Sequence, residues 1–424
     1  MYLIDLSMVR PGTSLGKTVY TPGGAVLLAE GTRLSQTYID ALRRRGFASI
    51  YIEDGLSDDV RPMDAVADHT RANAAAHVAK MFDIVSTTAG IKSGPPARKT
   101  QYRDRSATHD LEDRELPLPS EGTNMLEMLY RDVEQIMNEI MASDTAISLD
   151  TLKSHSDYTF QHSVEVAIVS IVLGGALGLP IPQIRELALG ALLHDIGKVS
   201  ISQDILNKPG KLTEEEFAEI KTHPDLGFEL VRRLPIPSIL PAHVAYQHHE
   251  RQDGGGYPRG LVGNNRILRL EAQRLHPSRI LLIAEIASVA DVFCALASER
   301  PYKPAYPLDR VGRMLEEMAG PHLNRDVVNM LLRTIPMYAV GHWIEVKTGA
   351  YLGWRGVVTN VDIAALHAPS IRLHLDPSRE PVASPVEIDL RQDRDVKIVC
   401  VPPGENPFDP PRSASGAMAA PSAT

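Results

Sequence analysis

Histidine is concentrated in one part of this chain. Of its 15 histidines, seven lie between His155 and His249. Together with two aspartates, five of them lie at or near the edges of expected helices: His162, His194, Asp195, His223, His248, His249 and Asp291. Imidazole nitrogens and carboxylate oxygens without sulfur suit iron, manganese or zinc. Because these groups exceed the four ligands of one tetrahedral ion, the pattern predicts two closely spaced metal ions.

Each of these residues taken alone has an ordinary structural explanation. A single histidine in a helical protein is usually a surface residue or a satisfied core group. The combination is different, because packing demands do not produce a His-Asp pair followed by Gly-Lys, or a His-His-Glu run followed by a glycine-rich turn. Since His194 and Asp195 lie about 100° apart on a helix, both reach one cluster only if it lies beside that helix.

The motifs resemble those of the HD superfamily of metal-dependent phosphohydrolases, and in particular its HD-GYP branch. His194–Lys198 (HDIGK) resembles the first signature, and His248–Pro258 (HHERQDGGGYP) resembles the second. Between them His223–Gly227 matches the HP-x-x-G element, and Ala290–Val292 and Arg300–Lys303 match the closing segments. The resemblance covers roughly residues 150–335 in the family's order.

The resemblance implies a helical-bundle phosphodiesterase that opens cyclic di-GMP, a bacterial second messenger, to pGpG and in some members onward to GMP. It implies a catalytic role for Asp195, as a bridging carboxylate, and for Lys198. The implied metal ligands are His162, His194, Asp195, His223, His248, His249 and Asp291. The implied nucleotide-binding residues are Tyr257, Arg300 and Lys303. The expected cofactors are two divalent metal ions, iron or manganese.

General chemistry agrees with these roles, although simpler explanations exist for the cations. Two adjacent metal ions activate water and stabilise both the attacking and the leaving oxygen of a phosphodiester. Lys198 can offset charge on the phosphate or protonate the leaving oxygen; its alternative is a cation near a helix end. Arg300 can clamp a phosphate in two-pronged fashion with Lys303 beside it. A solvated surface pair is the alternative for these two.

Several departures from the family pattern keep other functions open. Tyr158 stands where some members carry a glutamate for a third metal, which favours two metals over three. Glu285 replaces a frequent arginine, Cys294 a frequent aspartate, and the segment 258–290 is long for the family. One alternative is an inactive cyclic di-GMP-binding module that signals through contacts with diguanylate cyclases or other proteins. The other alternative is a phosphohydrolase of another nucleotide.

The elements that must position these residues form a mainly α protein, an HD-type helical bundle with smaller modules at both ends. Residues 124–336 show helical periodicity, and residues 1–89 alternate short β and helical patterns as a small mixed α/β N-terminal module. Between them, residues 90–123 are expected to be a flexible linker. Residues 337–402 are expected to form a β-rich extension, and residues 403–424 a disordered tail.

Composition excludes several classes of protein. The 44 basic and 53 acidic residues give a net charge of −9, which argues against a partner such as a nucleic-acid polymer. The 2 cysteines exclude a disulfide framework and favour a reducing cytoplasmic location. The sequence shows no signal peptide and no sustained apolar run long enough for a membrane segment. By analogy with similar bundles, the chain could form a homodimer, and the sequence does not decide this.

Overall fold

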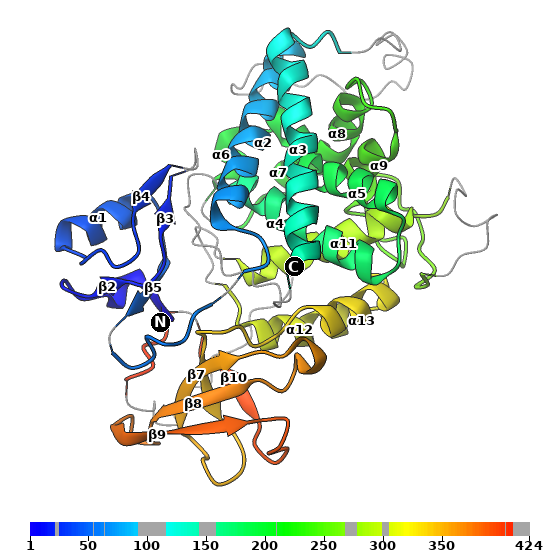
Figure 1. Ribbon diagram of the computed structural model, residues 1–424. Helices are drawn as coiled ribbons and strands as arrows, with labels where there is room; N and C mark the ends of the chain where they lie inside the picture. Colours follow the sequence, from blue (N-terminus) through cyan, green and yellow to red (C-terminus); the bar gives the residue numbers. More distant parts are fainter. Residues whose placement is uncertain are drawn as a thin grey trace.

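The computed structural model describes residues 1–21, 25–53, 55–62, 64–91, 116–143, 158–208, 210–267, 278–298, 305–402 and 404–409. A bundle of helices forms the largest part, and two groups of strands from the chain ends lie beside it (Figure 1). The predicted fold class, mainly α with a small mixed N-terminal module and a β-rich C-terminal part, is confirmed.

The bundle is built around one mostly apolar helix, α4 (Tyr158–Ala176). Val166, Ala167, Ile168 and Val169 are successive along the helix and all completely buried, so the middle of α4 is covered on every side, as expected for a core helix. Among the described residues it alone is long and apolar enough to cross a membrane, and 67% of the relevant stretch is buried inside the protein. The pattern is that of a core helix.

Helices from both directions along the chain pack around α4 and its neighbours. They are α2 (Asp68–Thr88), α3 (Ser120–Ala142), α5 (Ile181–Leu193), α9 (Leu240–Gln247), α11 (Leu282–Ala297) and α13 (Arg325–Thr334). Further helical segments complete the bundle: η4 (Ile196–Ser200), α6 (Gln203–Leu206), α7 (Glu214–Ile220), α8 (His223–Val231) and α12 (Leu308–Met318).

The position of α2 differs from the division expected from sequence. Residues 68–88 were assigned to the N-terminal module, but Ala74, Val78 and Met81 of α2 are buried in the core of the bundle. Helix α3 begins at Ser120, inside the range expected to be linker, most of which lies outside the described residues. A long helix next to a polar linker gives no local signal of the surface against which it packs.

The N-terminal module is a small sheet with one helix. Strands β1 (Tyr2–Asp5), β5 (Ser49–Glu53) and β2 (Ser14–Leu15) pair in that order, all antiparallel. Strands β3 (Val19–Tyr20) and β4 (Val26–Leu28) form a second, two-stranded sheet. Helix α1 (Gln36–Arg44) begins where the Ser35 hydroxyl accepts a hydrogen bond from the Tyr38 N–H.

The C-terminal part is an antiparallel sheet of five strands in the order β10-β6-β7-β8-β9. The strands are β6 (Trp343–Val346), β7 (Arg355–Asn360), β8 (Ser370–Leu375), β9 (Pro381–Asp389) and β10 (Ile398–Cys400). Of the expected disordered tail, only residues 404–409 are described, and the Phe408 ring packs against Trp343. The rest of the tail lies outside the described residues.

The two ends of the chain share one hydrophobic core. Trp343, Val357 and Leu375 of the C-terminal sheet are buried together with apolar residues of the N-terminal module. The Tyr2 and Trp343 rings meet edge to face at 5.3 Å. Ser57 and His374 are buried in the same region, and Ser57 Oγ lies 2.8 Å from His374 Nε2. Because burial of apolar area is the main source of stability in such contacts, the two end modules form one body beside the bundle (Figure 1).

Candidate metal centre

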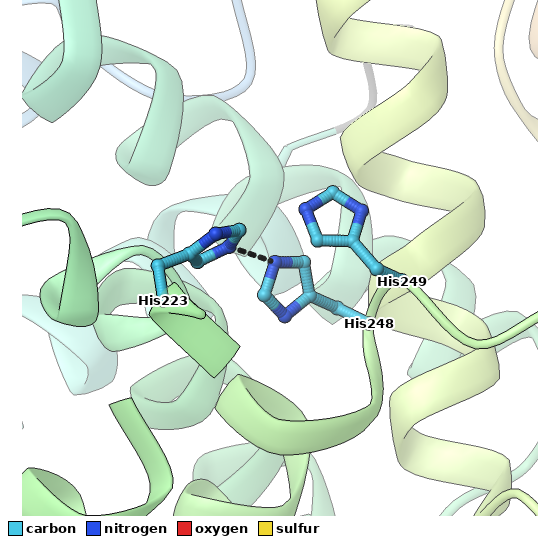
Figure 2. Close-up of side chains that lie close together, drawn as sticks. All are labelled: His223, His248 and His249. Carbon is cyan, nitrogen blue, oxygen red and sulfur yellow. Dashed lines mark hydrogen bonds between the residues drawn. The ribbon is translucent and has the colours of Figure 1, made fainter. Parts of the chain in front are cut away.

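The seven residues predicted as metal ligands converge on one region of the bundle. They come from α4 (His162), the end of α5 (His194), the turn before η4 (Asp195), the start of α8 (His223), the end of α9 (His248 and His249) and α11 (Asp291). Their ligand atoms form two groups, each within 4.8 Å: His223 with His248 and His249, and His162 with His194 and Asp195. In Figure 2 the imidazoles of His223 and His248 face each other with His249 beside them.

Asp195 lies at the centre of this arrangement and is only 2% exposed. Its Oδ1 lies 3.4 Å from His223 Nε2 and 3.9 Å from His248 Nε2. Its Oδ2 lies on the other side, 3.3 Å from His194 Nε2. The two oxygens therefore face different histidines, which is the orientation that a carboxylate needs to bridge two metal ions.

Asp291 and His162 complete the cluster. His162 Nε2 lies 2.9 Å from Asp291 Oδ1, which joins α4 to α11. The rings of His162 and His194 meet with their centroids 5.6 Å apart. The pair therefore lies on the His194 side of Asp195.

Backbone carbonyls fix the orientation of three imidazoles. The Nδ1–H groups of His194, His223 and His248 donate to the carbonyls of Ala191 at 2.7 Å, Ile220 at 2.7 Å and Ala245 at 2.9 Å. With the proton on Nδ1, the lone pair of each ring lies on Nε2 and points toward Asp195. Outer hydrogen bonds of this kind are typical of metal-binding histidines.

Burial sets the charge state of the centre. It lowers the pKa of His223 to about 3 and that of His249 to about 4, and it holds the pKa of His248 well below its ordinary value. Burial also acts on His194, but the adjacent Asp195 carboxylate outweighs it and raises the His194 pKa. The rings of His223, His248 and His249 are therefore neutral at pH 7, the form in which histidine binds metal.

The two carboxyl groups have the opposite shift. Burial raises the pKa of Asp195, but His194 and Lys198 outweigh it and bring the pKa well below the ordinary value. The pKa of Asp291 is lowered in the same way, with His162 as its main partner against burial. Both side chains are therefore ionised at neutral pH, as metal ligands must be.

Two glycines allow the elements that carry the ligands to approach one another. A Cβ at Gly197 would lie 1.9 Å from the His223 carbonyl oxygen, so only glycine lets the start of α8 pack on the turn after Asp195. A Cβ at Gly256 would lie 2.4 Å from the Arg251 nitrogen and 2.5 Å from the His249 oxygen. Both motif glycines are therefore required by close backbone contact.

The glycine-rich loop places Tyr257 against the centre. The Glu250 carboxylate, 3% exposed, accepts the backbone N–H groups of Arg259 and Leu261, both at 2.8 Å. The Tyr257 N–H donates to the His249 carbonyl at 3.2 Å, and the two rings stack with centroids 4.8 Å apart. His249 thus covers one face of the Tyr257 ring. Burial raises the Tyr257 pKa, which keeps the hydroxyl a donor.

The predicted cations fall into two groups. Lys198 Nζ donates to Asp195 Oδ2 at 2.5 Å, so this lysine lies directly beside the centre. Arg300 and Lys303 lie outside the described residues, and their predicted role in nucleotide binding stays a prediction.

The structure also reveals a buried polar network that sequence reasoning missed. Glu285, 2% exposed, accepts hydrogen bonds from Gln252 Nε2 at 2.9 Å and Asn324 Nδ2 at 2.8 Å. Gln252 in turn accepts the Asn265 N–H at 2.9 Å, and Asn324 caps α13. Glu285 therefore ties the glycine-rich loop and α13 to α11, which carries Asp291. The departure from the family's arginine was the signal that pointed to this position.

The donor set fits divalent metal ions. It contains only nitrogen and oxygen, as iron, manganese and zinc accept. Asp195 Oδ1 is buried without a hydrogen-bond donor among the described residues, although native proteins satisfy nearly all such atoms. A cation at this oxygen would remove the deficiency.

Comparisons with known proteins agree with this geometry. Residues 147–327 match the family model of the HD domain. The chain is 34% identical over 277 residues to a cyclic di-GMP phosphodiesterase of Pseudomonas aeruginosa, covering 64% of this chain and 62% of that protein. It is 35% identical over 209 residues to a cyclic di-GMP phosphodiesterase of Thermotoga maritima, covering 49% and 52%.

Two further proteins are similar to this chain, one named for a different substrate and one with a solved structure. The chain is 35% identical over 207 residues to a 3'3'-cGAMP-specific phosphodiesterase of Vibrio cholerae, covering 49% of this chain and 43% of that protein. The chain thus spans less than two thirds of the length of these relatives. An HDG"Y"P protein from Bdellovibrio bacteriovorus aligns with a TM-score of 0.43 at 16% identity, over 78% of this chain and 97% of that one.

Proposed function

We propose that this chain, which carries an HD domain at residues 147–327, is a metal-dependent phosphodiesterase that hydrolyses cyclic di-GMP. The observation that carries the proposal is the buried Asp195 carboxylate, whose two oxygens face different histidines. The names of the similar Pseudomonas and Thermotoga proteins support the substrate. The products would be pGpG and, after a second cleavage, GMP, and the reaction would lower the second messenger in a bacterial cytoplasm.

The chain's own residues have distinct roles in this mechanism. Two iron or manganese ions held by the five histidines, Asp195 and Asp291 would supply an activated water and offset charge on the phosphate. Asp195 holds both halves of the ligand set together. The Lys198 ammonium, 2.5 Å from Asp195 Oδ2, carries a proton that can pass to the leaving ribose oxygen. The Tyr257 hydroxyl stays protonated and can donate to a phosphate oxygen.

A second candidate substrate, 3'3'-cGAMP, is supported by the name of one similar protein. One similar protein from Vibrio cholerae is named as specific for 3'3'-cGAMP. The metal centre itself does not distinguish cyclic dinucleotides, because it acts on the phosphodiester. The other alternative is a module that binds cyclic di-GMP without cleaving it.

One assay separates these proposals. The purified full chain would be loaded with Fe(II) or Mn(II) without oxygen and given equal concentrations of cyclic di-GMP and 3'3'-cGAMP, with chelator-treated protein as control. We expect metal-dependent release of pGpG from cyclic di-GMP. Faster cleavage of 3'3'-cGAMP would favour the second substrate, and binding without cleavage under either metal would overturn the enzyme proposal.

A further inference from the structure

Lys221 is an exposed lysine held by two aromatic rings next to the metal centre. It lies at the C-terminal end of α7, and its Nζ is 4.5 Å from the centroid of the Phe217 ring. The same ammonium is 5.5 Å from the centroid of the Tyr257 ring. Both distances lie in the range of cation–π attraction, which favours this position of the side chain.

Lys221 is connected to the centre in two ways. In space, the Tyr257 ring that it contacts stacks on the imidazole of His249 at 4.8 Å. Along the chain, Lys221 precedes Thr222, the N-cap of α8, and His223 is the first residue of that helix. The ammonium is therefore one aromatic ring away from a metal-ligand imidazole.

The contacts of Lys221 leave its hydrogen-bond donors available. Among the described residues no carboxylate lies within ion-pair distance of its ammonium, whereas Lys198 is paired with Asp195. An aromatic face attracts the charge of an ammonium but does not use its three N–H donors as an anion does. The position is thus that of a cation ready to receive an anionic ligand.

We propose that Lys221 binds the phosphate of the cyclic dinucleotide that is not being cleaved. This inference rests on the proposed function and adds a specificity residue to it. A cyclic dinucleotide carries two phosphodiesters, and while one lies at the metal centre the other remains negatively charged. A lysine provides a compact point charge for such a group. Phe217 and Tyr257 hold that charge in place before the substrate arrives.

The test compares two substrates in the Lys221→Met variant, which keeps the length of the side chain and removes its charge. For cyclic di-GMP we expect KM to rise about tenfold with little change in kcat, as for the loss of one charged hydrogen bond in binding. For bis(p-nitrophenyl) phosphate, which has a single phosphate, we expect KM to stay unchanged. Lys221→Arg should retain most of the affinity for cyclic di-GMP.

Two further variants serve as controls. Lys211→Met removes another exposed lysine from the loop before α7 and should leave both KM values unchanged. Phe217→Leu removes one ring contact and should raise KM for cyclic di-GMP by a smaller factor. Metal content and the thermal unfolding midpoint of each variant show whether the centre is intact.

The outcomes are distinct. An equal rise of KM for both substrates would mean that Lys221 acts by positioning Tyr257, and it would overturn the inference. An unchanged KM for cyclic di-GMP would overturn it as well, while the proposed function would stand. A wild-type protein that cleaves bis(p-nitrophenyl) phosphate but no cyclic dinucleotide would overturn both.

Discussion

Helix α4 carries two buried charged clusters that differ in how their charge is compensated. Its Glu165 receives two hydrogen bonds from Arg71 Nη1 at 2.6 and 2.7 Å, and Arg71 also donates to Asp64 at 3.3 Å. Both Arg71 and Glu165 are nearly inaccessible, at 3% and 2% exposure. Three residues earlier on the same helix, His162 belongs to the metal centre, where the buried carboxylates are surrounded mainly by neutral imidazoles.

The difference separates a structural cluster from a functional one. Burying charge is costly, and the chain compensates Glu165 with its own guanidinium. At the candidate metal centre the described residues supply two carboxylates and five imidazoles, with Lys198 as their one paired lysine or arginine, and Asp195 Oδ1 has no hydrogen-bond donor among them. A buried cluster that the chain leaves electrostatically incomplete indicates the place where cations bind.

The largest expected change in stability concerns the buried ion pair of Arg71 and Glu165. Arg71→Met leaves the Glu165 charge buried without its main partner and should lower the free energy of unfolding by about 3–5 kcal/mol. Urea denaturation measures this loss. Arg71→Met combined with Glu165→Met removes both charges and should recover most of it. If the double variant were as unstable as the single one, the ion pair would not be the cause.

Asp195→Ala tests the candidate metal centre, where the buried charge lacks a full set of partners. Removing the carboxylate between the histidines should lower kcat/KM by at least about a hundredfold, more than the loss of an outer partner of a metal ligand usually costs. Elemental analysis should show less bound metal per chain, and circular dichroism should show an unchanged helical content. Full activity with a normal metal content would contradict the bridging role.

The close contact at Gly197 should matter for both stability and metal binding. Gly197→Ala places a Cβ 1.9 Å from the His223 oxygen, and the resulting shift of α8 should cost about 2 kcal/mol of unfolding free energy and weaken metal binding. Gly175→Ala is the matched control on exposed α4 surface, where a Cβ meets nothing within 4 Å. That variant should be about 0.5–1 kcal/mol more stable. Equal effects of the two changes would contradict the packing argument.

The metal-free protein should lose stability gradually as pH falls below about 6.5. His223 and His249, with pKa values near 3 and 4, stay neutral in the folded state while the same residues bind protons when unfolded. Because the unfolded state then holds more protons, stability falls as the pH falls, by roughly 1.4 kcal/mol per pH unit for each ring that stays neutral, and His248, whose pKa is also lowered, adds to the effect. His194, whose pKa is raised, opposes it only near pH 7, because at lower pH both states hold its proton. Denaturation of metal-free protein at pH 7, 6 and 5 measures the slope. A stability independent of pH in this range would show that these histidines are not buried neutral.

The sequence by itself predicted a set of candidate ligands for the centre. Motifs such as His194–Lys198 place ligand types at fixed local spacings, and the apolar periodicity of the helices predicts a bundle. These signals are local, because a helix or a turn depends on residues a few positions apart. Six of the seven predicted ligands form two compact groups, and Asp291 joins them through its contact with His162, whereas their binding of metal stays a prediction.

Only the tertiary structure decided which elements meet. The packing of α2 into the bundle and the buried role of Glu285 depend on surfaces contributed by distant segments. The contact of Ser57 with His374 joins residues separated by 317 positions. Hydrophobic burial is non-directional, so the local sequence of an apolar surface does not specify which distant segment packs against it. The candidate ligands could therefore be predicted from sequence, whereas the arrangement of the modules around them was set by long-range packing.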